Sequence, residues 1–114
     1  MDLDFDAIFY YVADLDRAVT FYRDLLGFKL LSRDVVARFD IRGVLLEVVP
    51  TQDVSRLDGH GNARLCLRVD DIHAAVAELR RRGIPVGEEE RKENGFLAEL
   101  HDPDGNEICL WQYA

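Results

Sequence analysis

Side chains with useful chemistry recur at every second position along several short stretches of this chain. Arginine, cysteine, glutamate and aromatic residues alternate there with apolar residues, and in a β-strand residues two apart share one face. A carboxylate so placed can act as a base, an arginine can bind an anion, and an aromatic ring can stack on a planar or cationic compound. The candidate ligand-binding residues are Phe9, Tyr11, Glu47, Arg64, Cys66, Arg68, Cys109 and Trp111.

Two amphipathic helices are predicted to support these stretches, because one helical sequence pattern occurs twice in the chain. Residues 14–27 and 71–83 each begin with an aspartate suited to an N-cap, continue with apolar residues at helical spacing, and end at a glycine. A second match aligns 43–50 with 105–112. Two matches in the same order indicate an internal duplication.

Each half is predicted to fold as β-α-β-β-β. Turn signals separate the strands: Arg42-Gly43, Glu93-Asn94-Gly95 and the sequence Asp102-Pro-Asp-Gly105. We predict one domain of two modules, about 5–50 and 63–114, joined by a linker over 51–62. The expected strands are 5–13, 28–33, 35–41, 44–49, 63–69, 84–91, 95–101 and 107–112, and the second helix is expected over 70–82.

Composition narrows the possible partners. The chain has 114 residues and a formal net charge of −8, which disfavours nucleic acid and anionic membranes as partners. Its acidic first residues lack the basic start and apolar core of a signal peptide, and no apolar run approaches the roughly 20 residues of a membrane span. We therefore expect a cytoplasmic protein, in which Cys66 and Cys109 are reduced core residues.

The segment Asp-Leu-Asp-Arg-Ala-Val-Thr-Phe-Tyr-Arg-Asp-Leu-Leu-Gly-Phe, together with Asp-Pro-Asp-Gly-Asn-Glu at 102–107, resembles the vicinal oxygen chelate superfamily. That superfamily includes glyoxalase I, bleomycin-resistance proteins, fosfomycin-modifying enzymes and extradiol dioxygenases. The resemblance implies an α+β fold of paired βαβββ modules, whose sheets curl into a cup with the helices outside. It also implies that many members form homodimers, and we expect a homodimer here.

In metal-dependent members of that superfamily, the first and last strands of each module supply His and Glu ligands. The matching positions in this chain are Ala7, Glu47, Arg64 and Cys109. Alanine has no donor atom and a guanidinium repels a cation, and two remaining ligands are fewer than the three of a catalytic zinc site. We therefore predict no metal site and no cofactor.

The three histidines do not supply the missing ligands. His60 lies between two glycines, His73 is expected off the buried face of its helix, and His101 ends a strand. No two of the three histidines have a spacing suited to joint coordination of a metal ion, so we expect them to be scattered surface residues.

Strand alternation predicts what fills the cup instead. Leu65 and Leu67 form the face that packs on a helix. Arg64, Cys66 and Arg68 alternate with them, so these three side chains face the cup. Arg64 and Glu47 then occupy positions that converge in metal-binding relatives, and we expect an ion pair between them. The predicted lining residues are Ala7, Phe9, Tyr11, Leu45, Glu47, Val49, Arg64, Cys66, Arg68, Glu107, Cys109 and Trp111.

Three functions remain open on this evidence. The first is a metal-free binding protein that resembles the bleomycin-resistance type and sequesters a planar or cationic compound in the aromatic cup. The second is a glyoxalase-, dioxygenase- or transferase-like enzyme with an altered site, in which Glu47 is a general base and Arg64 or Arg68 holds an anion. The third is an interaction domain whose cup is closed by self-association.

Overall fold

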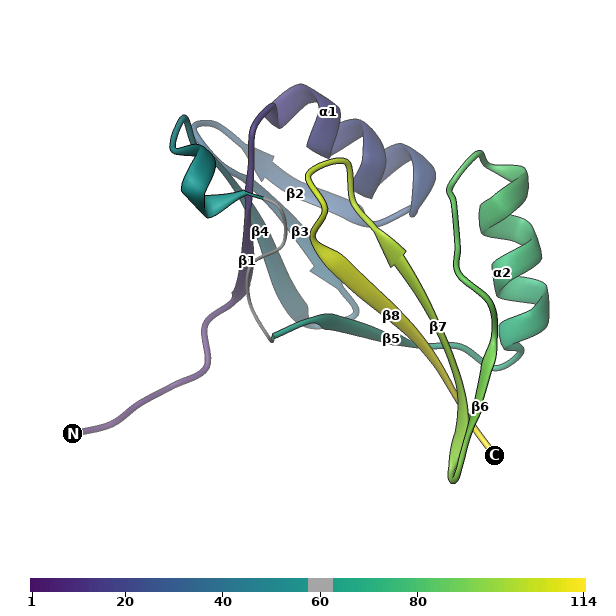
Figure 1. The fold of residues 1–114 in the computed structure, drawn as a ribbon. Helices are drawn as coiled ribbons and strands as arrows, with labels where there is room; N and C mark the ends of the chain where they lie inside the picture. Colours follow the sequence, from purple (N-terminus) through teal and green to yellow (C-terminus); the bar gives the residue numbers. More distant parts are fainter. Residues whose placement is uncertain (58–62) are drawn as a thin grey trace. The chain divides into compact units, whose positions relative to one another are not determined.

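The computed structural model describes residues 1–57 and 63–114, so His60 lies outside the described residues. The chain divides into two compact units, Met1–Leu57 and Asp58–Ala114. Each unit has a four-stranded mixed sheet with helical structure, which confirms the predicted α+β class and the βαβββ order (Figure 1). Among the described residues, no helix combines the length and apolar character needed to cross a bilayer.

The first module contains a sheet in the order β1-β4-β3-β2, in which β1 and β4 run parallel and the other pairs antiparallel. Its first strand begins at Ile8 rather than at residue 5 as predicted, because residues 5–7 pair with no strand. The elements are β1 (Ile8–Val12), α1 (Leu15–Val19), the π-helix η1 (Thr20–Leu25), β2 (Lys29–Arg33), β3 (Ala37–Ile41), β4 (Val44–Pro50) and the 3₁₀-helix η2 (Val54–Arg56).

The second module repeats this arrangement in the order β5-β8-β7-β6, again with the first and last strands parallel. Its elements are β5 (Leu65–Arg68), α2 (Ile72–Arg81), β6 (Glu90–Lys92), β7 (Gly95–His101) and β8 (Glu107–Tyr113). Ile8 pairs with Leu46 in the first module, and Leu65 pairs with Ile108 in the second. These are equivalent positions under the two sequence matches, so the predicted duplication holds in the register of the strands.

The helix of the first module begins as predicted but changes type after one turn. The Asp14 carboxylate accepts a hydrogen bond from the backbone N–H of Arg17, and Gly27 has a φ of +79°. Between them the chain forms a π-helix, although a single α-helix was expected. The wider turn lets the consecutive residues Phe21 and Tyr22 both be buried, whereas only Tyr22 belonged to the predicted apolar face.

The core of each module lies between its helix and one face of its sheet. In the first module the Tyr22 ring stacks on Phe28 and lies 5.8 Å from the ring of Phe39 in β3. In the second module, α2 packs on β7 and β8, and its buried residues are Ile72 and Val76. The other residues of each strand point to the opposite face of its sheet, away from the helix. The candidate site residues in the strands lie on these opposite faces.

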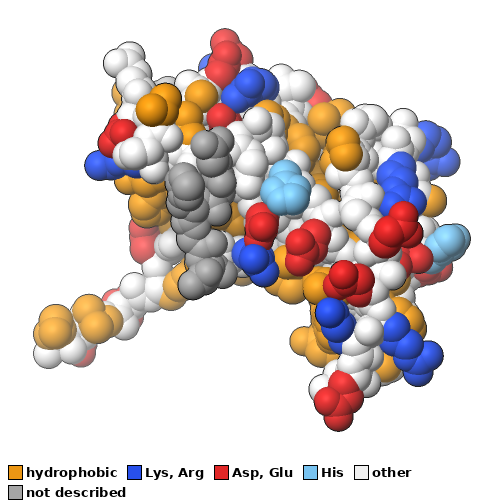
Figure 2. Space-filling model, in the orientation of Figure 1, with side chains coloured by type: hydrophobic (Ala, Val, Ile, Leu, Met, Phe, Trp, Pro, Cys, Tyr) orange, Lys and Arg blue, Asp and Glu red, His pale blue; other side chains and the backbone are white. Residues whose placement is uncertain are grey.

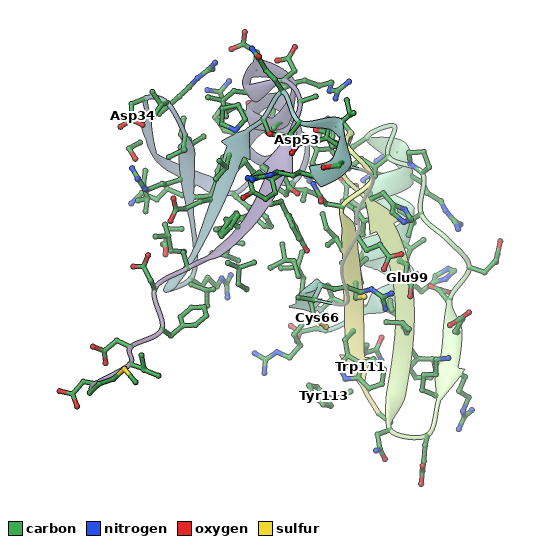
Figure 3. The ribbon with its side chains drawn as sticks, turned by 60° about the vertical axis from the view of Figure 1, so that its left-hand side comes forward. Asp34, Asp53, Cys66, Glu99, Trp111 and Tyr113 are labelled. Atoms are coloured by element: carbon green, nitrogen blue, oxygen red, sulfur yellow. The ribbon has the colours of Figure 1, made fainter. Side chains whose placement is uncertain are left out.

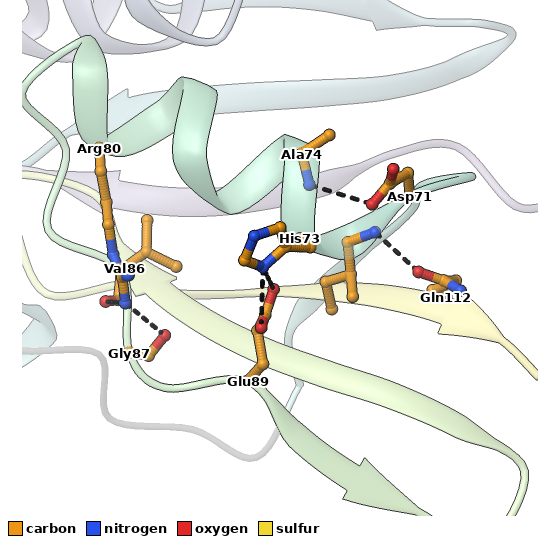
Figure 4. A network of polar contacts seen from close by, with 9 residues as sticks. Asp71, His73, Ala74, Arg80, Val86, Gly87, Glu89 and Gln112 are labelled. Carbon is orange, nitrogen blue, oxygen red and sulfur yellow. Dashed lines mark hydrogen bonds and ion pairs between the residues drawn. The ribbon is translucent and has the colours of Figure 1, made fainter.

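Helix α2 is tied to its module by polar contacts (Figure 4). The Asp71 carboxylate caps its first turn by accepting from the backbone N–H of Ala74 at 3.0 Å. The side-chain oxygen of Gln112 in β8 accepts from the backbone N–H of Ile72 at 2.7 Å. Near the end of the helix, Arg80 donates to the carbonyls of Val86 and Gly87. The helix is thus held at both ends by bonds to its own module.

The turns follow the predicted signals, with one shift. Arg42 and Gly43 both have positive φ, as a two-residue type I′ hairpin turn requires. In the later hairpin Lys92 pairs with Gly95, so the turn residues are Glu93 and Asn94 rather than Asn-Gly. The predicted strand over 84–91 is largely absent, because only the bridge Val86–Leu100 and the short β6 pair with β7.

The surface charges are mixed rather than segregated on the face that Figure 2 draws. Asp and Glu side chains lie among Lys and Arg side chains there. Several form ion pairs with neighbours in the chain, such as Glu78 with Arg82 at 2.9 Å and Glu90 with Lys92 at 3.2 Å. Exposed pairs of this kind add little to stability, about 0–1 kcal/mol each.

Candidate functional site

The sheet face of the first module that lies opposite its helix carries an aromatic pair and an ion pair. Phe9 and Tyr11 are two residues apart on β1, and their rings meet edge to face at 5.3 Å between centroids. Phe9 is paired in register with Glu47 of β4, which in turn pairs with Arg38 of β3. The Arg38 Nε lies 3.5 Å from the Glu47 Oε2. Phe9 is 52% exposed, which is unusual for so large an apolar ring and leaves it free to contact a ligand.

Arg56 completes this face from the segment that was predicted to be only a linker. Its guanidinium lies 4.9 Å from the centroid of the Tyr11 ring, and its Nη1 donates to the Tyr11 hydroxyl at 2.8 Å. The Asp53 carboxylate accepts from both the N–H and the hydroxyl of Ser55 and pairs with Arg56. The Ser55 hydroxyl lowers the pKa of Asp53, so this carboxylate keeps its negative charge beside Arg56.

The corresponding face of the second module is built from rows of residues on three adjacent strands. In the first row Arg64 forms an ion pair with Glu107, and His101 Nε2 lies 3.7 Å from the other oxygen of Glu107. In the second row Cys66 of β5, Cys109 of β8 and Glu99 of β7 are paired in register. The third row consists of Arg68 of β5, Trp111 of β8 and Leu97 of β7, which are also paired in register.

Trp111 is half-buried and forms an aromatic pair with Tyr113 on β8, as Phe9 and Tyr11 do on β1. Its ring meets that of Tyr113 edge to face at 5.8 Å, and Tyr113 is 67% exposed. The opposite side of the Trp111 ring lies over Gly95, where a Cβ would come within 2.6 Å of ring atom Cζ2. Gly95 therefore makes room for this ring. Figure 3 shows Trp111, Tyr113 and Cys66 on the same side of the second sheet.

The two cysteines are free thiols in different environments. Cys66 is exposed, so its prediction as a core residue is wrong, because its side chain lies on the sheet face opposite α2. Cys109 is 7% exposed, and burial, with a smaller effect from the Glu99 carboxylate, raises the pKa of its thiol.

The residues at the positions implied as metal ligands do not form a metal centre. Glu47 is bound to Arg38 and Arg64 to Glu107, each within its own module. Ala7 has no donor atom. Within the part of the chain that the structure describes, no group of three or more His, Cys, Asp or Glu side chains is placed to hold a metal ion. The donor set is thus unsuited to the divalent ion of metal-dependent members.

The structure places the candidate residues of β1, β4, β5 and β8 on a sheet face opposite a helix, with Arg64 directly before β5, and it adds partners that were missed. Glu99 and His101 could have been found, because β7 alternates in the same way as β8. Arg38 also follows from alternation along β3. Arg56 carried no such signal, since it meets Tyr11 across 45 residues of chain. The predicted ion pair between Arg64 and Glu47 stays a prediction, with both residues already holding other partners.

Comparisons with known proteins agree with this architecture. The family model of the Glyoxalase/Bleomycin resistance protein/Dioxygenase superfamily matches residues 4–110. A lactoylglutathione lyase of Neisseria meningitidis serogroup A is 30% identical over 112 residues, covering 85% of this chain and 81% of that protein. Among solved structures, the antibiotic binding protein TnmS3 from Streptomyces sp. CB03234 is 29% identical, covers both chains completely, and has a TM-score of 0.79.

A second protein of Streptomyces sp. CB03234, described as a glyoxalase/bleomycin resistance protein, is 30% identical, with a TM-score of 0.72 over 94% of this chain and 100% of that one. The family model spans nearly the whole chain, and its two-module plan is the one that the strand registers show. This chain therefore belongs to the Glyoxalase/Bleomycin resistance protein/Dioxygenase superfamily.

Proposed function

We propose that this protein binds a planar or cationic small molecule without a metal and sequesters it, as a member of the bleomycin-resistance type. The observation that carries the proposal is an aromatic pair, with one exposed and one half-buried ring, on the sheet face opposite the helix of each module. The pairs are Phe9 with Tyr11 and Trp111 with Tyr113. Such rings offer flat apolar surface to a planar ligand and a negative face to a cation.

Charge and relatives support the same proposal. The chain carries a net charge of −8, and Glu47 and Glu107 lie on the faces that carry the aromatic pairs. A cationic ligand would meet carboxylates whose present partners are arginines of the same sheet, which can be displaced at low cost because these pairs are partly exposed. The structural relative TnmS3, of 29% identity, is an antibiotic binding protein.

The proposal is tested by titrating the protein with planar cationic dyes, ethidium first, and following the fluorescence of Trp111. Trp111 is the only tryptophan in the chain, so its emission reports directly on the second-module face. We expect saturable quenching that weakens in Tyr113→Ala, and we expect dye binding by the first-module pair, followed by the fluorescence of the dye, to weaken in Phe9→Ala. Phe5→Ala is the matched control, because Phe5 is also an exposed phenylalanine, at 74% against 52% for Phe9, but lies before β1.

Two outcomes would overturn the proposal. One is the absence of saturable binding by planar compounds, cationic or neutral. The other is binding that is unchanged in both Phe9→Ala and Tyr113→Ala, which would place the ligand away from the aromatic pairs.

An enzymatic function is the second candidate, favoured by the relatives named lactoylglutathione lyase at about 30% identity. In that case Glu47 is the general base and Arg64 or Arg68 holds an anionic group of the substrate. Two measurements separate the binding protein from the enzyme. The first is elemental analysis of freshly purified protein, and the second is an assay of lactoylglutathione turnover with and without added zinc, nickel or manganese. Turnover that Glu47→Gln abolishes would favour the enzyme.

We also propose a cytoplasmic homodimer, on the basis of family membership and of exposed apolar residues Leu31, Val35 and Val44 in the first module. Sedimentation equilibrium tests the dimer, and a monomer at all concentrations would contradict it. Neither nucleic acid nor a membrane is proposed as a partner, because a net charge of −8 disfavours binding to either.

A further inference from the structure

Two thiols lie side by side on the open face of the second sheet. Cys66 of β5 and Cys109 of β8 are Cα partners in a parallel register, so both side chains point to the same side of the sheet. They are the only two cysteines of the chain, and both are free. Cys66 (Figure 3) is exposed, whereas Cys109 is buried, so solvent reaches the pair through Cys66.

We propose that Cys66 and Cys109 form a two-thiolate site for a soft, two-coordinate cation, with monovalent copper as the chemical class. Neighbouring strands lie about 4.7–4.9 Å apart. A metal–sulfur bond is about 2.3 Å long in protein thiolate sites, so a linear sulfur–metal–sulfur unit spans nearly the distance between two strands. Two cysteines facing the same way from adjacent strands can therefore hold such an ion without backbone movement.

The surroundings select a soft cation over a hard one. Thiolates favour Cu(I), whereas zinc and the hard divalent ions require more ligands or oxygen donors. Among the described residues, no three His, Cys, Asp or Glu side chains converge to supply such a set. A two-coordinate ion needs only the pair, so the described residues fit it better than an ion that needs three or more ligands.

The charges also balance near this pair. On binding, each thiol releases a proton to solvent and forms one sulfur–copper bond, and copper remains in its monovalent state. Two thiolates and one Cu(I) leave a single negative charge. Arg64 and Arg68 stand two residues before and after Cys66, while Glu99 is paired in register with Cys109 and Glu107 forms an ion pair with Arg64, so both cations and carboxylates surround the two thiolates.

The test is an anaerobic titration in which the full chain competes with bicinchoninic acid for Cu(I), in the presence of a non-thiol reductant. We expect the wild-type chain to withdraw one Cu(I) per chain. Cys66→Ser and Cys109→Ser should each fall to the level of the double variant. His101→Ala is the matched control, because it removes a potential metal ligand from the same face and should leave copper binding unchanged.

Urea unfolding of each variant shows whether it is folded, and X-ray absorption should find two sulfur neighbours around copper. Binding that survives in either single serine variant would overturn the proposal. So would a ratio of one copper to two chains with a doubled mass, since the ion would then bridge the exposed Cys66 of two molecules. Ligand binding by the aromatic pairs is measured on copper-free protein, so the two proposals fail independently.

Discussion

Arg38 and Glu47 form an ion pair across adjacent strands of the first sheet, with 3.5 Å between Nε and Oε2. Glu47 is the residue that the sequence singled out both as a candidate base and as the partner of Arg64. The structure gives it a partner from its own sheet, and its side chain is only 18% exposed. The Glu47 carboxylate is thus oriented by its own module before any ligand arrives.

This geometry makes a double-mutant cycle informative. We expect a coupling of about 0.2–1 kcal/mol between Glu47→Gln and Arg38→Met in the free energy of unfolding, because the pair is partly exposed. The measurement is urea unfolding of the wild type, both single variants and the double variant. A larger coupling between Glu47→Gln and Arg64→Met would instead support the pairing expected from the sequence, for which a buried pair would give about 3–5 kcal/mol on loss of one partner.

Gly95→Ala should destabilise the second module strongly. A Cβ at this position would lie 2.2 Å from the carbonyl oxygen of Gln112 and 2.6 Å from Cζ2 of Trp111, so either the strands or the ring must shift. We expect a loss of about 1–3 kcal/mol in the free energy of unfolding, with a change in the emission of Trp111.

Gly87→Ala provides the control for that substitution. Its added Cβ would meet only the carbonyl oxygen of Glu99, at an ordinary contact distance of 3.5 Å. Gly87→Ala should therefore leave both stability and Trp111 emission nearly unchanged. Equal losses in the two variants would show that close packing against Trp111 is not the cause.

Gln112→Ala should weaken the attachment of α2 to β8. The amide oxygen of Gln112 accepts from the N–H of Ile72, one of the groups at the start of the helix that have no partner inside it. Leaving that part-buried donor without its bond should cost about 1–3 kcal/mol. Hydrogen exchange at Ile72 should accelerate as well, whereas Gln52→Ala, an exposed glutamine outside the sheets, should change neither quantity.

Ser55→Ala should raise the pKa of Asp53 toward its ordinary value. The Ser55 hydroxyl is the main cause of the lowered pKa, followed by the Ser55 backbone N–H, which the substitution keeps. Since the folded pKa of Asp53 lies below its ordinary value, the stabilising contribution of this carboxylate is present above the ordinary pKa and is lost as the pH falls through the folded pKa.

Carbon-13 NMR titration of the side-chain carboxyl groups measures this effect. Asp34 is the internal control, because the backbone N–H of Val36 is the main cause of its own lowered pKa. If Asp53 has the same pKa in Ser55→Ala as in the wild type, the Ser55 hydroxyl is not the cause of the lowered pKa. Loosening of Asp53 should also broaden the resonances of Arg56 and Tyr11, since Asp53 pairs with Arg56.

The sequence by itself determined the modules and most of their elements. The aspartate caps at Asp14 and Asp71, the glycine ends and the alternation in β5 and β8 are local patterns, and local patterns depend on residues a few positions apart. The two sequence matches also place equivalent residues in the first and last strands of each half. The pairing of β1 with β4 and of β5 with β8 agrees with that placement.

Tertiary structure decided which partner each side chain on the open faces has. The pairing of Glu47 with Arg38, of Arg56 with Tyr11 and of Trp111 with the space over Gly95 joins segments that no periodicity links. The π-helix that buries Phe21 beside Tyr22 likewise depends on the sheet against which it packs. Spacing along a chain defines the face on which a side chain lies, but the partner on that face depends on strand order and register, which only the folded sheet supplies.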